Sequence, residues 1–225
     1  MDKEGKISVQ GKGAIHVVPD VTRLEVKIER VFEDYAKAYA QAKENFSWMV
    51  KILEYNKKPG KLAKTIKFDI SDHEVSDYDS KGHYSGSHLE GFELAQTIKI
   101  DLTIDNVLVN NIIRGIGKFI LGAQINIGYT LQDPRPSQLK MLSRAISDAK
   151  EKATIMAEAA GCKLGKVDSI EYNYQDIHTY SQARNIHSNS EAKASTAGSL
   201  DIAPDDLVIS DTVDVSWYLI EDTEV

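Results

Sequence analysis

Cysteine and proline are scarce in this chain of 225 residues, which has one Cys and five Pro. The single cysteine, Cys162, excludes an internal disulfide and any metal site built from several cysteines. Long apolar runs are also missing: the longest candidates, residues 112–120 and 213–220, fall short of the ~20 residues that cross a bilayer. We therefore expect no transmembrane segment.

A basic surface is missing as well, because the formal net charge is −7. Eight of the 34 acidic residues, and no Lys or Arg, fall in residues 201–225, so the remainder of the chain is close to neutral. Proteins that bind nucleic acid by charge carry a cluster of Lys and Arg on one face. No such cluster is visible, and we expect no nucleic-acid partner.

The N-terminus, MDKEGKISVQ, has neither an apolar core region nor a small-residue cleavage site, so it does not read as a secretory signal. The sequence as written predicts a cytoplasmic protein. The alternative is a periplasmic or cell-envelope protein whose native N-terminus has been trimmed.

Strand-like alternation recurs along the chain, and the overall composition, 42% hydrophobic and 27% charged, is that of a globular protein. Apolar and polar residues alternate in the segments 7–18, 21–32, 64–70, 92–102, 124–131, 167–174 and 208–220. Pro19 separates the first two segments. Because proline cannot donate to a sheet ladder, it predicts an edge, a bulge or a corner between two strands there.

Three segments have helical spacing instead. Residues 34–55 repeat apolar side chains every three or four positions, and Asp105 can cap a second helix. A third helix is expected to begin at Ser137 and to end at Gly161, a glycine suited to the position after a helix. The element order is then ββ-α-ββ-α-β-α-ββ. This order predicts an α+β protein with a largely antiparallel sheet and helices packed on one face.

The segment 176–204 is rich in Ser, Ala, Asn and Thr and is predicted to be a long flexible loop. We expect one domain over residues 1–225, with two subdomains as the alternative. The acidic strand at the C-terminus is expected at a sheet edge, where Asp211 and Asp214 would hinder unwanted pairing, unless these acids only aid solubility. The loop before it is the expected place of a subunit or partner contact.

Several stretches in order resemble the SIMPL domain family. They are the strand Ile7-Ser-Val-Gln-Gly-Lys-Gly13 with the step Pro19-Asp20, the helix Ala145-Ile-Ser-Asp-Ala-Lys-Glu-Lys-Ala153, the step Gly161-Cys-Lys-Leu-Gly165, and Ile202-Ala-Pro204 before a strand with alternating valines. The resemblance covers residues 7–220. Its structural signature is Gly11, Gly13, Pro19, Asp20, Ala145, Ala149, Ala153, Gly161 and Gly165.

The resemblance implies little chemistry. The family is named for a signalling protein that associates with a pelle-like kinase, and its bacterial members are mostly envelope proteins linked to stress tolerance. Some members assemble into large homo-oligomers, and no catalytic residue set is established for them. The resemblance therefore implies a homo-oligomer, or a protein partner, and no cofactor.

The densest group of potential ligands lies in residues 72–88. Its imidazoles and carboxylates suit a divalent metal, and the candidates are His73, His83, His88, Asp77 and Asp79. Their spacing fits no standard motif, and strand alternation would send them to opposite faces. A solvated hairpin is the competing interpretation. Trp48, Tyr174 and Trp217 similarly mark either a binding face or ordinary packing.

We expect a non-enzymatic protein that acts as a homo-oligomeric scaffold or a stress-related interaction protein, because no nucleophile, base and orienting group converge in the sequence. The alternative is a metal-dependent hydrolytic enzyme that uses the segment from His73 to His88. A small-ligand binder is a third hypothesis, although the sequence offers no evident set of polar anchors.

Overall fold

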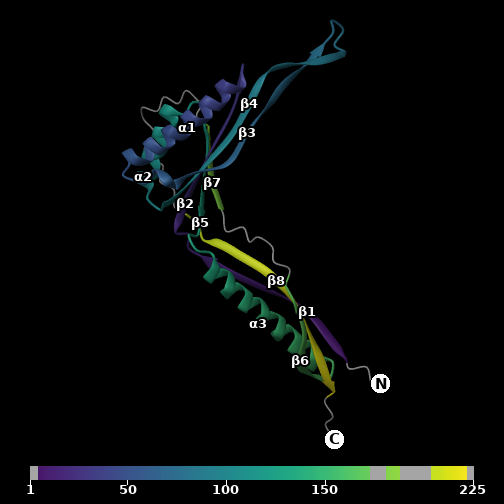
Figure 1. The fold of residues 1–225 in the computed structure, drawn as a ribbon. Helices are drawn as coiled ribbons and strands as arrows, with labels where there is room; N and C mark the ends of the chain where they lie inside the picture. Colours follow the sequence, from purple (N-terminus) through teal and green to yellow (C-terminus); the bar gives the residue numbers. More distant parts are fainter. Residues whose placement is uncertain (1–4, 173–180, 188–203, 222–225) are drawn as a thin grey trace. The chain divides into compact units, whose positions relative to one another are not determined.

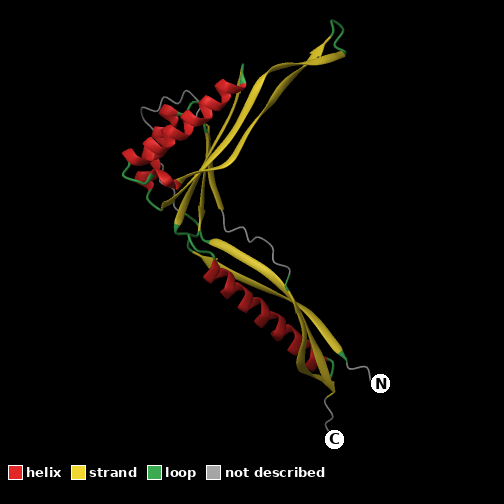
Figure 2. Ribbon diagram, in the orientation of Figure 1, coloured by secondary structure: helices red, strands yellow, loops and turns green. Residues whose placement is uncertain are grey.

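The computed structural model describes residues 5–172, 181–187 and 204–221, and for residues 181–187 it describes the backbone alone. Figures 1 and 2 show the helices and strands of these residues. In chain order they are β1 (Lys6–Val17), β2 (Val21–Phe32), α1 (Tyr35–Tyr55), the 3₁₀ turn η1 (Gly60–Leu62), β3 (Ala63–Tyr78), β4 (Tyr84–Thr103), α2 (Asn106–Phe119), β5 (Gln124–Thr130), α3 (Arg135–Ala159), β6 (Cys162–Glu171), β7 (Ser181–His187) and β8 (Leu207–Glu221).

The predicted α+β class is confirmed, and every strand pair in the described residues is antiparallel. The strands form two sheets, with the orders β1-β8-β6 and β3-β4-β2-β5-β7. The chain correspondingly divides into two compact units. The first holds β1, α3, β6 and β8, and the second holds the other elements. No helix of the described residues has the length and hydropathy that a membrane crossing requires.

The first unit is built on the first and last strands of the chain. Strand β1 pairs with β8 along the whole length of β1, from Lys6 opposite Tyr218 to Val17 opposite Leu207. Helix α3 lies along one face of this sheet (Figure 1). It packs Ala145, Ala149 and Ala153 against the inward side chains of β8, among them Trp217, which is 3% exposed.

The second unit has the larger core. Its helices α1 and α2 lie on the same side of the five-stranded sheet, as Figure 2 shows in red. Each helix begins at an aspartate whose side chain accepts a hydrogen bond from a backbone N–H three residues on: Asp34 from Lys37 and Asp105 from Leu108. The predicted cap at Asp105 is thus confirmed. Fully buried Ile and Leu side chains of β2, β4 and β5 pack beneath the helices.

Pro19 and Asp20 mark the passage of the chain from one unit to the other. Strand β1 ends at Val17 in the first sheet, and β2 begins at Val21 in the second sheet. The backbone N–H of Asp20 already donates to the carbonyl of Thr130 at 3.2 Å, beside the pairing of β2 with β5. Pro19 is predicted to mark an edge, a bulge or a corner between two strands, and in the structure the chain leaves one sheet there and enters the other.

Three local predictions were wrong. Residues 181–187, inside the predicted loop 176–204, form β7 at an edge of the second sheet, while most other residues of that segment lie outside the description. Strand β8 was expected at an edge but is central, because it pairs with β1 and with β6. Helix α3 begins at Arg135 instead of Ser137, since Pro134 and Pro136 suit a helix start, where an N–H has no partner anyway.

Candidate functional site

The signature glycines of β1 lie directly beneath α3. A methyl group added to Gly11 would lie 2.0 Å from the carbonyl oxygen of Ala145, and one added to Gly13 would lie 2.1 Å from that of Met141. Ala149 also faces Gly11, and the alanines are fully buried. The glycines and the alanine stripe therefore let a helix backbone rest on a strand backbone, which is a role in packing.

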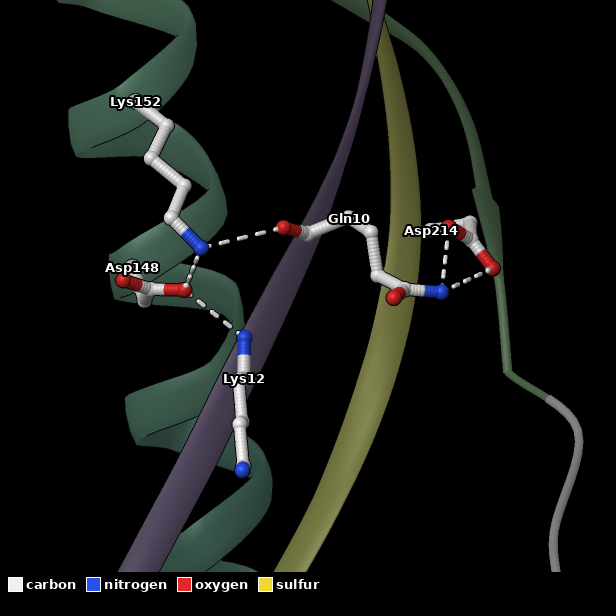
Figure 3. A network of polar contacts seen from close by, with 5 residues as sticks. All are labelled: Gln10, Lys12, Asp148, Lys152 and Asp214. Carbon is white, nitrogen blue, oxygen red and sulfur yellow. Dashed lines mark hydrogen bonds and ion pairs between the residues drawn. The ribbon is translucent and has the colours of Figure 1, made fainter.

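Helix α3 also supplies polar partners for the outer edge of β1. Figure 3 shows Lys152 and Asp148 of α3 reaching Gln10 and Lys12 of β1. Lys152 Nζ donates to the Gln10 carbonyl at 3.3 Å, and Asp148 Oδ2 accepts from the Lys12 backbone N–H at 2.7 Å. One turn earlier in α3, Arg144 Nη1 donates to the Ala14 carbonyl at 2.9 Å.

The side chains of α3 meet the backbone groups of β1 in order because the two elements repeat at nearly equal distances. Alternate residues of a strand lie about 6.7 Å apart, and residues four apart in a helix lie about 6 Å apart. The backbone groups of residues 10, 12 and 14 therefore meet side chains 152, 148 and 144 in order. This row occupies backbone groups that an edge strand would otherwise offer to another chain.

Asp148 is the centre of this row. Its carboxylate accepts from Lys152 Nζ at 2.7 Å as well as from the Lys12 N–H. The Lys152 hydrogen bond, followed by the Lys12 N–H, holds the pKa of Asp148 below its ordinary value of 3.8. Across β1, Gln10 Nε2 donates to Asp214 of β8 at 3.2 Å, so Asp214 lies inside the sheet pairing.

The rest of the signature lies at turns and close approaches. Gly161 follows α3 with a φ of 72°, which confirms the predicted glycine after the helix. A methyl group on Gly165 would lie 2.7 Å from the carbonyl of Tyr218, where the pairing of β6 with β8 shifts register. Together with Pro19 and Asp20, these residues shape the first unit and its exit, and the geometry gives them structural roles.

The candidate metal ligands lie on the β3–β4 hairpin as separate pairs. His88 Nδ1 lies 2.9 Å from Asp77 Oδ1, and His83 Nδ1 lies 3.3 Å from Asp79 Oδ2. His73 instead lies between two glutamates on opposite ring nitrogens: Glu90 is 3.4 Å from Nε2, and Glu93 is 4.0 Å from Nδ1. Among the described residues, no three His, Cys, Asp or Glu side chains gather as a metal site would require. The sequence placed these residues on one hairpin correctly, and the structure brings them together only in twos.

The outer part of this hairpin, residues 73–91, is here called the arm. Strand β4 pairs with β2 only from Phe92 onward, so the two strands of the arm pair with each other alone in the described structure. The arm extends past the helices in Figure 1. Its part of β3, His73 to Tyr78, has six residues, which correspond to a length of about 20 Å. Tyr78 and Tyr84 lie in edge contact near its tip, and each is 65% exposed.

A cleft of about 640 Å³ lies between α1 and α2, here called the helix cleft. Trp48 of α1 and Phe119 of α2 stack in it, with ring centroids 4.5 Å apart. Lys51 lies 4.5 Å from the centre of the Trp48 ring, and Lys118 lies 5.1 Å from that of Phe119. Its lining residues include Trp48, Lys51, Tyr55, Arg114, Lys118 and Phe119.

The helix cleft is the main feature that sequence reasoning missed. Lys51 and Tyr55 follow Trp48 by three and seven residues, and Arg114 and Lys118 lie four apart, so each set follows one helix face beside the core stripe. That spacing was a usable signal. The sequence could not show that the two faces adjoin, because the helices belong to segments separated by β3 and β4.

The remaining candidates belong to different parts of the chain. Trp217 belongs to the core of the first unit, Trp48 lines the helix cleft, and Tyr174 lies outside the described residues. Cys162 is partly buried at the start of β6, with its thiol 3.8 Å from the carbonyl of Ala160. A second groove, of about 570 Å³, lies between α3 and β6, but its lining mixes lysines with Glu158.

Comparison with known protein families identifies a family for this chain. The family model SIMPL, described as a protein of unknown function (DUF541), matches residues 7–217. That range covers most of the first unit and all of the second unit, with the arm and the helix cleft. No curated protein was found to match the chain.

Proposed function

Because the chain belongs to the SIMPL family, whose biochemical function is not known, we propose that it acts by binding and not by catalysis. Its role in this proposal is that of a homo-oligomeric scaffold or a stress-related interaction protein. The arm is the observation that carries the proposal. It replaces the segment 176–204 as the expected contact surface, since part of that segment is the strand β7.

The arm has the properties of an element that another chain covers. A ribbon of two strands is only marginally stable in water, and both edges of the arm lack a third strand in the described structure. Exposed apolar side chains add to this, because Tyr78, Tyr84 and Leu89 are each more than half exposed. A second copy of the chain would cover these groups.

Light scattering of the intact chain, coupled to size exclusion, tests the proposal. We expect a particle several times heavier than the 25.0 kDa chain. The informative variant, here called the arm-less chain, replaces residues 74–90 with Asn-Gly. His73 and Gly91 are cross-strand partners, so a two-residue turn can join them. We expect the arm-less chain to be monomeric, and a monomeric intact chain at the highest attainable concentration would refute the proposal.

The alternative function, metal-dependent hydrolysis, is tested on the same hairpin. Purified protein would be analysed for bound zinc before and after the substitutions His83→Ala and His88→Ala. Stoichiometric zinc that both substitutions remove would favour the hydrolase. The binding proposal expects no stoichiometric metal, because the described imidazole–carboxylate pairs supply two ligands each, and a catalytic zinc site takes three protein ligands.

A further inference from the structure

The helix cleft combines three cations with an aromatic surface. Lys51, Arg114 and Lys118 line it, and none of the described residues that line it is Asp or Glu. None of the three has an ion-pair partner in the described part of the chain, although Glu44 accepts a hydrogen bond from Trp48 beside the cleft. In a chain with a net charge of −7, such a site is complementary to an anionic and aromatic partner.

The arm has the matching properties. Its 19 residues carry four acids, Glu74, Asp77, Asp79 and Glu90, against one lysine, Lys81. Tyr78 and Tyr84 lie beside Asp77 and Asp79 at the outer end, and both rings are largely exposed. An acidic, aromatic projection and a basic, aromatic recess therefore occur on the same polypeptide.

We propose that the arm of one copy docks in the helix cleft of a second copy. The tyrosines meet the stacked pair Trp48 and Phe119, and the carboxylates of the arm meet Arg114 and Lys118. This inference rests on the proposed function, since it assigns both halves of the contact between copies. Aromatic pairs and cation–carboxylate pairs both strengthen when neighbouring contacts exclude water from them.

This contact joins two different surfaces. Each copy offers one arm and one cleft, so it can hold two neighbours. Such head-to-tail contacts close into rings or continue as filaments, whereas a contact between two arms would stop at a dimer. Assembly beyond a dimer, weakened by salt, is the expected behaviour of the intact chain.

Two single defects test the contact separately. The arm-less chain keeps the cleft, and a cleft-reversed chain carrying Arg114→Glu and Lys118→Glu keeps the arm. We expect the arm-less chain alone and the cleft-reversed chain alone to be monomeric. In the cleft-reversed chain, the reversed charges should weaken self-association at least about tenfold. Lys43→Glu, on α1 but outside the helix cleft, is the matched control and should assemble like the intact chain.

Mixing the arm-less chain with the cleft-reversed chain tests directly whether the arm binds the helix cleft. One intact arm and one intact cleft remain, so the mixture should form a 1:1 pair and nothing larger in light scattering. If the intact chain assembles but the mixture stays monomeric, or if the cleft-reversed chain assembles normally, the docking inference is wrong while the scaffold proposal stands. A monomeric intact chain would overturn both.

A charge exchange covers the case in which the arm-less chain fails to fold. Asp77→Lys with Glu90→Lys reverses the arm within the full-length chain, and both side chains are exposed. Combining these substitutions with Arg114→Glu and Lys118→Glu should restore at least part of the lost assembly. Absence of any rescue, with circular dichroism unchanged, would contradict the proposed pairing.

Discussion

At the scale of single residues, the packing of α3 on β1 depends on glycines and alanines, whose side chains are absent or small. Gly11 and Gly13 let the carbonyls of α3 approach β1, and Ala145 and Ala149 keep the helix surface equally shallow. Larger residues at these positions would separate the two backbones. The row Arg144, Asp148 and Lys152 could then no longer reach the edge of β1.

A pair of glycine substitutions tests this close approach. Gly13→Ala places a methyl group 2.1 Å from a backbone oxygen, so we expect it to lower the free energy of unfolding by about 1 to 3 kcal/mol or more. Gly117→Ala, in α2, meets no atom within 4 Å and should raise it by about 1 kcal/mol through helix propensity. Urea denaturation measures both. Equal effects of the two substitutions would contradict the packing role.

The depressed pKa of Asp148 predicts a dependence on pH. The lysine and backbone N–H that lower this pKa stabilise the fold fully above 3.8, and the stabilisation is lost as the pH falls through the folded-state value. Asp148→Asn keeps the shape without the charge. It should therefore lower the urea midpoint at neutral pH, and its difference from the parent chain should shrink as the pH falls below 3.8 and through the folded-state pKa of Asp148. A difference that does not change with pH would argue against the charge.

At the scale of elements, the periodicity of the sequence predicted well which segments are helices or strands. It predicted poorly which strands lie side by side. The helices α1 and α2 and most strands follow from spacing and, for α2, from the cap at Asp105. The central position of β8 does not, because its partner β1 lies about 200 residues earlier and β6 pairs with its other edge. Alternation reports which side chains are buried, and it says little about which strand lies alongside.

The arm also illustrates what element patterns miss. Its strands extend well beyond the predicted segments 64–70 and 92–102, since polar residues on a two-stranded ribbon leave no burial pattern. The histidine-rich segment was correctly placed on a hairpin. Its pairing as His88 with Asp77 depends on register, which the sequence does not specify there.

The arm-less chain should fold as stably as the intact monomer. No residue of the arm belongs to the core clusters of the described structure, so its removal should change the free energy of unfolding by no more than about 1 kcal/mol. Thermal unfolding at a concentration too low for assembly measures this. A large loss would mean that the arm supports the sheet itself.

At the scale of the whole molecule, the two units have separate cores. Each hydrophobic cluster of the described residues lies within one unit: Leu24, Ile98 and their neighbours in the second, Val215, Trp217 and theirs in the first. The sequence left one domain or two subdomains open. The Pro19–Asp20 step lies where the chain passes between the units. That it divides two sheets can be seen only once β1 is known to pair with β8 and β2 with β4.

Separate cores predict separate responses to damage. Gly13→Ala should increase hydrogen exchange in β1, β8 and α3, while the amides of β2, β4 and β5 keep their protection. Exchange followed by mass spectrometry resolves the two sets. A uniform increase across both units would show that they unfold as one.

The pairing of β1 with β8 has a consequence for synthesis on the ribosome. Residues 20–130 can collapse soon after they emerge, but β1 waits for β8, which begins only at Leu207. During that interval the partner edge of β1 stays open, and α3 can shield only the other edge. We therefore expect nascent chains stalled before residue 207 to recruit chaperones through their N-terminal strand.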